Sequence, residues 1–477
     1  MFRIKRNHVT TFNMFCIPIL LGVWIVSLIG STIYNGIYTS CTYLPIIFVL
    51  GYCFFFLVRR NSVLDIHLLI LFLFFIKLYL LPILIIINGG FNLLEYNSAI
   101  SFYILDSIIL QTLEWFSIIA GLCFIRVKEC KITNFNITIE KTTNKNIWRF
   151  ILFCVFIIVC AIVIFPSLLY KFRPIFFSSE TEEIMWKQSA SVAVSTIHPI
   201  IYYPINWLIT VTRLSIVYLL IILIWKKAAS GYRPIAIILS LVVIIGGLVL
   251  IVPDDVSASI MAALSILALT TKLYPKYAKK IIFFVIIVGA ALFIYMFLGR
   301  AFISQRGTDV GIEQLSKRLN AYFSGFVNSA TVYEMRGDKF TYFWGDFFRS
   351  FPVIKGFFVD SPTTTELFNQ TLGYDTIYNS QIIPLESQVY FYFGYVGVLV
   401  IPWFVLKVCF KFYNKLSTVQ GTYDYFINCF FSILIAFGTV MYDSFLIFYL
   451  CLIYVPLLFI NIFIKRKGLQ HERIDIS

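Results

Sequence analysis

The chain has 477 residues, of which 60% are hydrophobic and only 13% charged, and 50 of them are phenylalanine. Soluble globular proteins do not have this composition, and runs of about twenty apolar residues recur along the whole length. The net charge of +14 would suggest nucleic-acid binding in a soluble protein. Here most basic residues fall in short loops between apolar runs, where they set membrane orientation. We therefore predict an all-α polytopic membrane protein.

Twelve apolar segments follow one another along the chain. Each should form a helix, because the bilayer core offers no water to satisfy an irregular backbone. The first segment has no small-residue cleavage site after it, so we expect it to be retained as a helix. The second and eighth are the shortest. The segments are residues 12–34, 43–58, 64–88, 100–126, 147–169, 201–225, 234–252, 256–272, 281–299, 385–410, 423–441 and 444–464.

The loops between these segments alternate in charge and predict the orientation. The N-terminus MFRIKRNH and the tail KRKGLQHER are basic. Every second loop between them is basic as well, at residues 59–61, 126–149, 226–233, 272–280 and 407–415. The intervening short loops NGIYTSCT, NGGFNLLEYNS, PDD and MYDS carry no Lys or Arg. Because Lys and Arg concentrate on the cytoplasmic side of membrane proteins, both termini are predicted to be cytoplasmic.

Two predicted outer loops are long, residues 170–200 and residues 300–384. The second has about 85 residues, whereas a compact connection usually has about 2–8, and its many aromatic residues predict a folded structure. Within it, residues 311–336 have apolar side chains at helical spacing, which suits a helix lying on the membrane surface or packed on the bundle. The apolar positions are Leu315, Leu319, Phe323, Phe326 and Ala330.

These loops divide the chain into four parts. A transmembrane bundle of helices 1–9 covers residues 1–299, and the large extracytoplasmic loop covers 300–384. Transmembrane helices 10–12 cover 385–464, and a cytoplasmic tail covers 465–477.

The stretch GRAFISQRGTDVG directly follows an apolar run and places Arg300 and Arg306 at the predicted membrane–water boundary. Lipid headgroups lie at this depth, and a planar guanidinium binds two phosphate oxygens at once. The large loop as a whole carries eight basic and eight acidic residues, so it is not a general surface for polyanions. We predict that at least one of its arginines binds phosphate. The alternative for each is an ordinary surface pair with Asp309 or Glu313.

Two residues at the same boundary are candidates for a general base. Pro384 suits the first turn of a helix, which places Glu386 in that turn and Tyr390 one turn deeper. A carboxylate there suits a reaction at the interface, although an acid at a helix N-terminus also simply stabilises the helix dipole. His198 ends the smaller outer loop, and histidine is the usual general base near neutral pH. A purely structural role is its alternative.

Charged residues also occur inside the predicted membrane segments. Lys77 and Glu114 fall near the middle of consecutive segments, and Asp106 lies two turns from Glu114 on roughly the same face. Charges in a bilayer are costly and normally paired, so we predict a Lys77–Glu114 ion pair, with a proton or ion path as the alternative. The ten cysteines and four histidines show no metal-ligand spacing. No metal or other cofactor is predicted.

Two stretches of the chain are similar to a known family. RLNAYFSGFVNSATVYE is similar to the outer-loop Y-x-x-G helix of the bacterial O-antigen polymerases, also called oligosaccharide repeat unit polymerases, and SQVYFYFGYVG to their aromatic-rich x-F-G-x-x-G helix. Twelve helices with a large outer loop between the ninth and tenth also resemble this family. Arg300, ten residues and then Gly311 match a pattern of some members. The smaller outer loop has no second copy, because Arg173 has Ile184 at the equivalent place.

This resemblance implies a function and a set of roles. The substrates would be oligosaccharide repeat units on undecaprenyl diphosphate at the outer face of the bacterial inner membrane, joined by metal-independent glycosyl transfer during lipopolysaccharide or other polysaccharide biosynthesis. A lipid diphosphate leaving group needs its charge stabilised, which arginines can do. The implied partners are membrane lipid and a chain-length regulator protein, with no nucleic acid. The implied roles are catalysis for Glu386 and His198, diphosphate binding for Arg300, Arg306 and Arg349, and sugar binding for Tyr322, Trp344 and Tyr390.

Three other functions remain open. An O-antigen ligase shares the substrates and layout, but we expect it to have a histidine in the large outer loop, and residues 300–384 contain none. A polysaccharide flippase or exporter, which is not an enzyme, should spread its charges through many helices around a central cavity. A lipid-phosphosugar glycosyltransferase commonly carries an acidic pair in its first outer loop, and NGIYTSCT has no acid.

Overall fold

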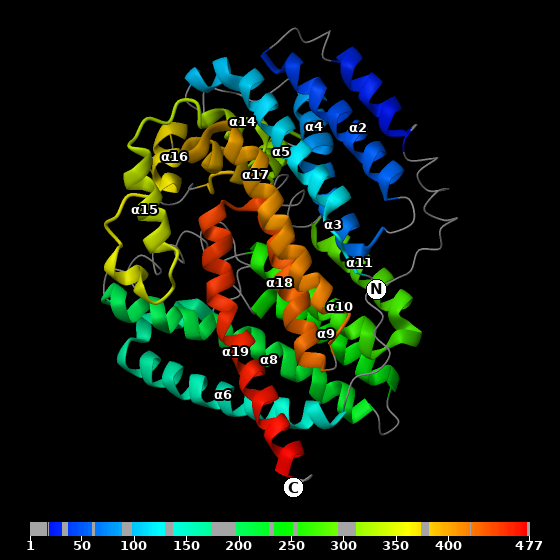
Figure 1. Ribbon diagram of the computed structural model, residues 1–477, viewed down its shortest axis with the longest axis vertical. Helices are drawn as coiled ribbons and strands as arrows, with labels where there is room; N and C mark the ends of the chain where they lie inside the picture. Colours follow the sequence, from blue (N-terminus) through cyan, green and yellow to red (C-terminus); the bar gives the residue numbers. More distant parts are fainter. Residues whose placement is uncertain are drawn as a thin grey trace.

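The computed structural model describes most of the chain, and every regular element in the described residues is helical (Figure 1). The described residues are 17, 19–30, 37–59, 63–87, 98–128, 137–172, 197–228, 233–250, 256–293, 312–373, 381–419 and 421–474.

The first half of the chain forms long apolar helices linked by short helical turns. Their bounds are η1 (Ile37–Thr42), α2 (Tyr43–Val58), α3 (Asp65–Phe75), the π-helical turn η2 (Ile76–Leu80), α4 (Leu81–Ile87), η4 (Ser98–Tyr103), α5 (Ile104–Phe124), α6 (Ile137–Ile164), η5 (Pro166–Phe172), α8 (Pro199–Ala228), α9 (Arg233–Leu250), α10 (Val256–Leu273), η6 (Pro275–Tyr277) and α11 (Ala278–Phe293).

The second half begins with the short helices of the large loop and ends with three long helices. Their bounds are α13 (Ile312–Tyr322), α14 (Phe326–Thr331), α15 (Lys339–Arg349), η8 (Ile354–Phe357), α16 (Thr364–Leu372), α17 (Leu385–Lys415), α18 (Thr422–Met441) and α19 (Ser444–Ile474).

Seven of the described helices are long and apolar enough to cross a membrane. They coincide with the second to sixth, the tenth and the eleventh of the predicted segments. The all-α membrane class is therefore confirmed, while the full count of twelve spans stays a prediction. Shorter apolar helices lie in the first, seventh, eighth and twelfth predicted segments, at Ile19–Gly30, Pro234–Ile244, Ile260–Leu273 and Ser444–Phe459.

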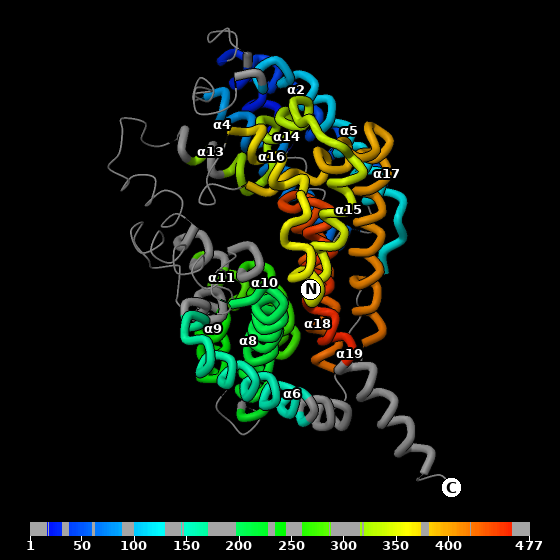
Figure 2. The backbone as a smooth tube through the Cα atoms, turned by 90° about the vertical axis from the view of Figure 1, so that its left-hand side faces the viewer, coloured from blue at the N-terminus to red at the C-terminus, as the bar shows by residue number. Residues whose placement is uncertain are grey.

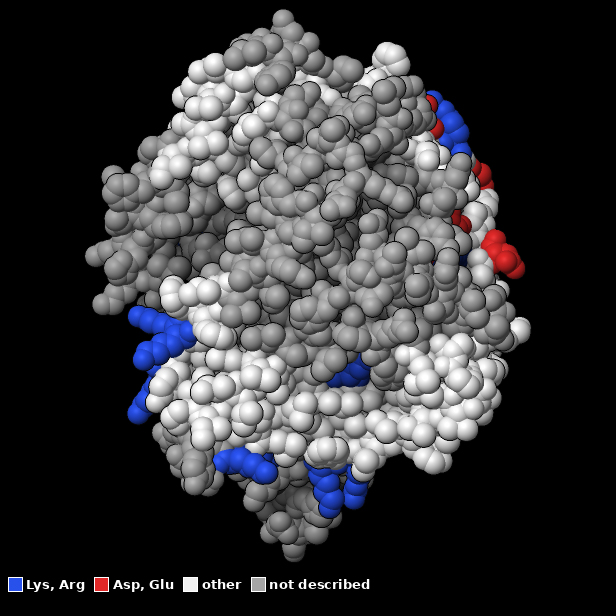
Figure 3. All heavy atoms as spheres, turned by 180° about the vertical axis from the view of Figure 1, so that it is seen from behind, with Lys and Arg blue, Asp and Glu red and all other residues white. Residues whose placement is uncertain are grey.

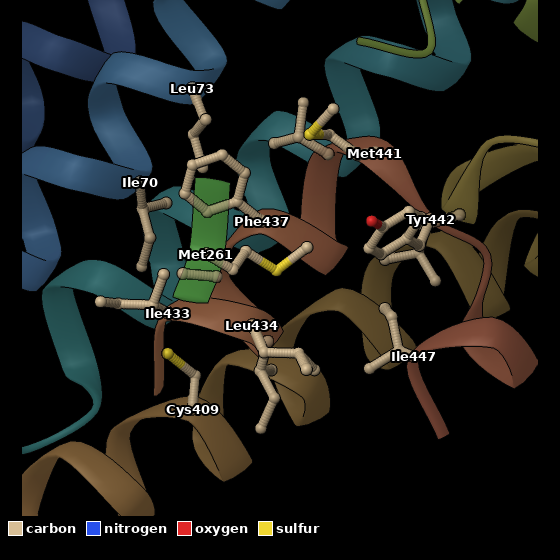
Figure 4. Packing of buried hydrophobic residues seen from close by; sticks show 14 of the residues in the cluster. Ile70, Leu73, Met261, Cys409, Ile433, Leu434, Phe437, Met441, Tyr442 and Ile447 are labelled. Carbon is tan, nitrogen blue, oxygen red and sulfur yellow. The ribbon is translucent and has the colours of Figure 1, made fainter. Parts of the chain in front are cut away.

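Helix α18 is the centre of the core, because all twenty of its residues are buried. It packs against α17, α10, α19 and α3. Figure 4 shows side chains from these helices meeting around it, including Ile70, Met261, Cys409 and Ile447. A membrane helix with no lipid-facing side is free to carry polar residues, and α18 has Asn428, Ser432 and Thr439 among its buried positions.

The large loop packs on the bundle. The helix predicted at residues 311–336 is instead two helices, α13 and α14, separated at Ser324, whose φ is 51°. A side chain at Gly325 would overlap the Asn320 side chain, so a glycine is needed here for close packing. α13 contacts α4 and α14 contacts α5, while Figure 1 shows α15 and α16 beside the first turns of α17 and α19.

Helix α17 has a kink at Gly394, whose φ of 63° and ψ of −157° are open to glycine almost alone. A Cβ at Gly397 would meet the Val389 carbonyl oxygen at 2.6 Å. The two glycines therefore shape α17 itself. The kink separates a short first segment, Leu385–Phe393, from the rest of the helix.

The helices form two groups in the side view of Figure 2, with α6, α8 and α9 in one and α2, α5, α14 and α17 in the other. In the space-filling view from behind, the lower half shows Lys and Arg without Asp or Glu, whereas both kinds lie along one upper edge (Figure 3). On this face the described acidic residues thus lie only in the upper part, whereas basic residues lie in both parts.

Candidate functional site

A polar cavity of about 250 Å³ lies where the large loop meets the first turns of α19. Most of its lining comes from α15, η8 and the start of α16, and the rest from α19 and the residue before it. We call it the polar cavity. Its lining residues are Asp346, Arg349, Ser350, Lys355, Thr363, Thr365, Glu366, Asp443, Phe445, Leu446 and Tyr449.

Asp346 is a buried carboxylate held by several donors. Gly345 lets α15 approach residues 361–363, because a side chain there would overlap the Pro362 carbonyl oxygen. Thr364 then donates to Asp346 through both its N–H, at 3.2 Å, and its hydroxyl, and Tyr392 Oη donates at 2.7 Å. Burial raises the pKa of Asp346 above its ordinary value. These bonds fix the carboxylate rigidly and occupy its lone pairs.

Gln388 joins Asp346 to a second acid, Asp443. Its Nε2 lies 3.1 Å from Asp346 Oδ2 and 3.1 Å from Asp443 Oδ1. Asp443 precedes α19 and accepts the N–H of Leu446 at 2.8 Å, the usual bond of an N-cap residue. Burial, followed by the nearby charge of Asp346, raises the pKa of Asp443 to about 7. A carboxyl that titrates near neutral pH suits general acid–base work.

Two cations line the same cavity. Arg349 Nη1 donates to Glu366 Oε1 and to the Ser361 carbonyl oxygen, at 2.7 and 2.8 Å. Lys355 makes no ion pair with a described residue; its ammonium lies instead 5.1 Å from the ring centre of Tyr203 and 4.9 Å from that of Tyr449. Burial, together with repulsion from Arg349, lowers the pKa of Lys355 to about 8. A desolvated cation with no carboxylate partner binds anions readily.

A neighbouring glycine, Gly356, also determines the position of Lys355. The turn η8 rests on the start of α8, and a side chain at Gly356 would overlap the backbone of Pro199 and Ile200. This close approach lets the Lys355 side chain reach between Tyr203 of α8 and Tyr449 of α19. The cavity thus depends on contacts between the large loop, α8 and α19.

A second polar cluster consists of Lys77, Glu114 and Glu386, and we call it the sealed cluster. Lys77 Nζ donates to Glu114 Oε2 at 2.7 Å and to Glu386 Oε2 at 3.0 Å, and none of the three side chains has exposed surface. Ser329 of α14 covers the outer side and donates to Glu386 Oε1 at 2.6 Å. The predicted Lys77–Glu114 ion pair is confirmed, and Lys77 lies in the π-helical turn η2.

The position of Glu386 differs from the expectation. It lies in the first turn of α17 as predicted, but it is wholly buried and bound to Lys77 rather than placed at a water-exposed boundary. The cause is the packing of α14 over α5, a long-range contact that the local sequence does not encode. His198 is exposed, its Nδ1 accepts the N–H of Ile200 at 3.4 Å, and it does not line the polar cavity.

The other predicted site residues are dispersed. Arg349 lines the polar cavity, whereas Tyr322, Trp344 and Tyr390 do not. Trp344 is partly exposed and stacks on Phe348, while Tyr390 lies against Tyr333 and Tyr395. Arg300 and Arg306 lie outside the described residues.

Sequence reasoning missed Asp346, Lys355 and Asp443 as site residues. Asp443 carried one local signal, because an Asp–Ser pair directly after a long apolar segment is a helix-start pattern. Asp346 and Lys355 carried none beyond their charge, since only tertiary packing brings them to Asp443. Within the part of the chain that the structure describes, no three His, Cys, Asp or Glu side chains are grouped closely enough to hold a metal ion.

Chemically, the polar cavity combines two cations with a carboxyl that exchanges its proton near pH 7. This arrangement can bind an anionic group while it accepts a proton from a neighbouring hydroxyl. Searches of family models, curated proteins and solved structures give no match to this chain.

Proposed function

We propose that this protein is a membrane glycosyltransferase that polymerises undecaprenyl-diphosphate-linked oligosaccharide repeat units into O-antigen or a related surface polysaccharide. The proposal includes twelve membrane spans, cytoplasmic termini, and an outer position for residues 300–384 in a bacterial inner membrane. The Lys and Arg residues gathered in the lower half of Figure 3 support this orientation.

The observation that carries the proposal is the composition of the polar cavity. Arg349 and Lys355 lie in one 250 Å³ cavity with Asp346 and Asp443. A diphosphate leaving group needs fixed positive charge, and an acceptor hydroxyl needs a base close to it. The cavity offers both, and its walls include the large loop that the family resemblance makes the catalytic region.

The proposed reaction transfers the growing glycan from its lipid diphosphate to the incoming repeat unit. The acceptor hydroxyl oxygen forms a bond to the anomeric carbon of the donor, and the bond from that carbon to the phosphate oxygen breaks. Asp443 accepts the hydroxyl proton, and the lipid diphosphate leaves with the bonding electron pair. Lys355 and Arg349 stabilise the charge that develops on the leaving group.

The two acids have different parts in this scheme. Asp346 accepts bonds from Thr364, Tyr392 and Gln388, so it positions Gln388 and raises the proton affinity of Asp443. Asp443 has fewer donors and takes the role of base that the sequence had suggested for Glu386. Arg300 and Arg306, near the start of the same loop in the sequence, remain predicted diphosphate ligands.

Deletion of the gene tests the proposal, with the surface polysaccharide displayed on a gel. Single repeat units on the lipid A core support a polymerase. Loss of every capped core would instead indicate a ligase or a flippase.

Complementation with Lys355→Met then links the activity to the cavity. We expect about 10²–10³-fold less polymer, the usual loss when one charge-stabilising donor is removed. Lys339→Met, an exposed lysine of the same loop, is the matched control and should restore full-length chains. If both variants give polysaccharide of the same chain length on the gel, the polar cavity is excluded as the site of the reaction.

A further inference from the structure

One face of α19 connects the polar cavity to a second, apolar hollow. Phe445 and Tyr449 line the polar cavity, and Leu452, Pro456 and Phe459 line the hollow. Steps of four, three, four and three residues keep all five positions within one narrow stripe of a helix with 3.6 residues per turn. The large loop makes the same transition in one step, because Ser350 lines the polar cavity and Phe351 lines the hollow.

The hollow, which we call the apolar groove, has a volume of about 520 Å³ and lies between α19, α8, α6 and the turn before η8. Every lining residue is apolar, among them Phe150 of α6, Trp207 of α8 and Val455 of α19. Trp207 is held by a 2.7 Å bond from its Nε1 to the carbonyl oxygen of Ile453. Pro456 lacks an N–H and so bends α19 at this place.

The groove is long in one direction. Its α19 residues extend from Leu452 to Phe459, and its loop residues include Val353 and Ile354. Val353 of the loop and Phe459 of α19 are about half exposed, at 48% and 52%. The groove is therefore open to the surroundings beside a helix that we place in the bilayer, and the stripe on α19 links it to the polar cavity.

We propose that the apolar groove binds the isoprenoid chain of the lipid diphosphate whose head group occupies the polar cavity. This inference rests on the proposed function, which supplies the lipid diphosphate. One groove suits one hydrocarbon chain, and two adjacent cations, Arg349 and Lys355, suit a diphosphate. An ordinary phospholipid, with two chains and one phosphate, matches neither feature. The groove would hold the chain lengthwise along α19 and so fix the position of the anomeric carbon beside Asp443.

Chain-length dependence of binding tests the groove. The probes are geranyl diphosphate and undecaprenyl diphosphate, whose affinities are measured on the purified full-length protein in nanodiscs. Val455→Trp fills the groove, and Val408→Trp places the same bulk on an exposed position of α17 as the matched control. Excluding as few as two methylene groups from the groove should lower the affinity of Val455→Trp for undecaprenyl diphosphate by about tenfold. Its affinity for geranyl diphosphate should stay at the wild-type value, and the control variant should bind both diphosphates like wild type.

A second measurement does not depend on how Val455→Trp folds. Undecaprenyl diphosphate with a photoreactive group in mid-chain should label wild-type residues of α19 or α8 around Trp207. Labelling confined to other helices, an unchanged chain-length preference in Val455→Trp, or a phospholipid that displaces the probe from the groove would each overturn the inference. A wild-type protein that binds neither diphosphate would instead overturn the proposed function.

Discussion

The first segment of α17, Leu385–Phe393, contributes to two polar clusters of opposite character. Glu386 faces the sealed cluster, and Gln388, two positions later, faces the polar cavity; two steps on a helix turn about 200°. In the sealed cluster, Lys77 binds both carboxylates and no side chain is exposed. In the polar cavity, Lys355 has no carboxylate bound to it among the described residues, and Asp443 titrates near pH 7.

This difference separates charge that holds a membrane protein together from charge that is available for chemistry. Lys77 binds two carboxylates through direct ion pairs, so breaking the cluster leaves charge in a medium that solvates it poorly. The charged groups of the polar cavity are only partly paired with opposite charges, so they are available to bind an anionic ligand and to exchange a proton. The predictions below test this separation, beginning with the largest effect.

Lys77→Met should prevent stable assembly, because it leaves Glu114 and Glu386 buried without a cation. Removing one partner of a buried ion pair typically costs about 3–5 kcal/mol. Thermal unfolding in detergent, followed by size-exclusion chromatography, measures the loss. Lys411→Met, an exposed lysine on α17, should unfold like wild type, and adding Glu114→Gln and Glu386→Gln to Lys77→Met should recover part of the stability. A fully stable single variant would contradict a structural role for the cluster.

Asp443→Asn should lower polymerisation by about 10²–10⁴-fold, the usual contribution of a general base. The fold should persist, because asparagine caps a helix about as well as aspartate and still accepts the N–H of Leu446. Initial rates with purified lipid-linked repeat units measure the effect. Asp360→Asn removes an exposed acid of the same loop and should leave the rate unchanged. A normal rate in Asp443→Asn would exclude it as the base.

The pH dependence of the rate should form a narrow bell. Asp443 has to be ionised to accept a proton, so the rate rises through its pKa of about 7. Lys355 has to be protonated to bind phosphate, so the rate falls through its pKa of about 8. Lys355→Arg should remove the alkaline fall, because arginine stays charged. A wild-type rate that is flat from the acid side to the alkaline side would contradict both assignments.

The same raised pKa affects stability with a defined sign. Between the ordinary pKa of an aspartate, 3.8, and about 7, the folded protein holds a proton on Asp443 that the unfolded chain has lost. The free energy of unfolding should therefore fall as the pH rises through this window. Asp443→Asn should remove that part of the slope, which unfolding curves at several pH values would measure.

Gly394→Ala should have the smallest effect, about 1–3 kcal/mol of strain, because alanine disfavours this backbone conformation. No atom lies within 4 Å of an added Cβ, so the cost comes from the backbone alone. Unfolding temperature measures it. Gly22→Ala, also in open space but with ordinary helical φ, is the control and should not lower the unfolding temperature. If both variants unfold alike, the kink is not specified by Gly394.

The comparison also shows what the sequence can predict. Apolar runs predicted the spans, because each membrane helix must satisfy its own backbone, and the cost of intramembrane charge predicted the Lys77–Glu114 pair. The third member of that cluster, Glu386, could not be paired with Lys77 in advance, since the two lie 309 positions apart. Lys355 and Asp443 were missed for the same reason: their roles come from contacts of η8 and α19 that no local pattern records.

The burial of α18 has a consequence for the position of Asp443. This helix touches only other helices, so the thickness and composition of the lipid act on it solely through its neighbours. Asp443 follows its last turn directly. The position of Asp443 is therefore set by the packing of the polypeptide rather than by the lipid around it.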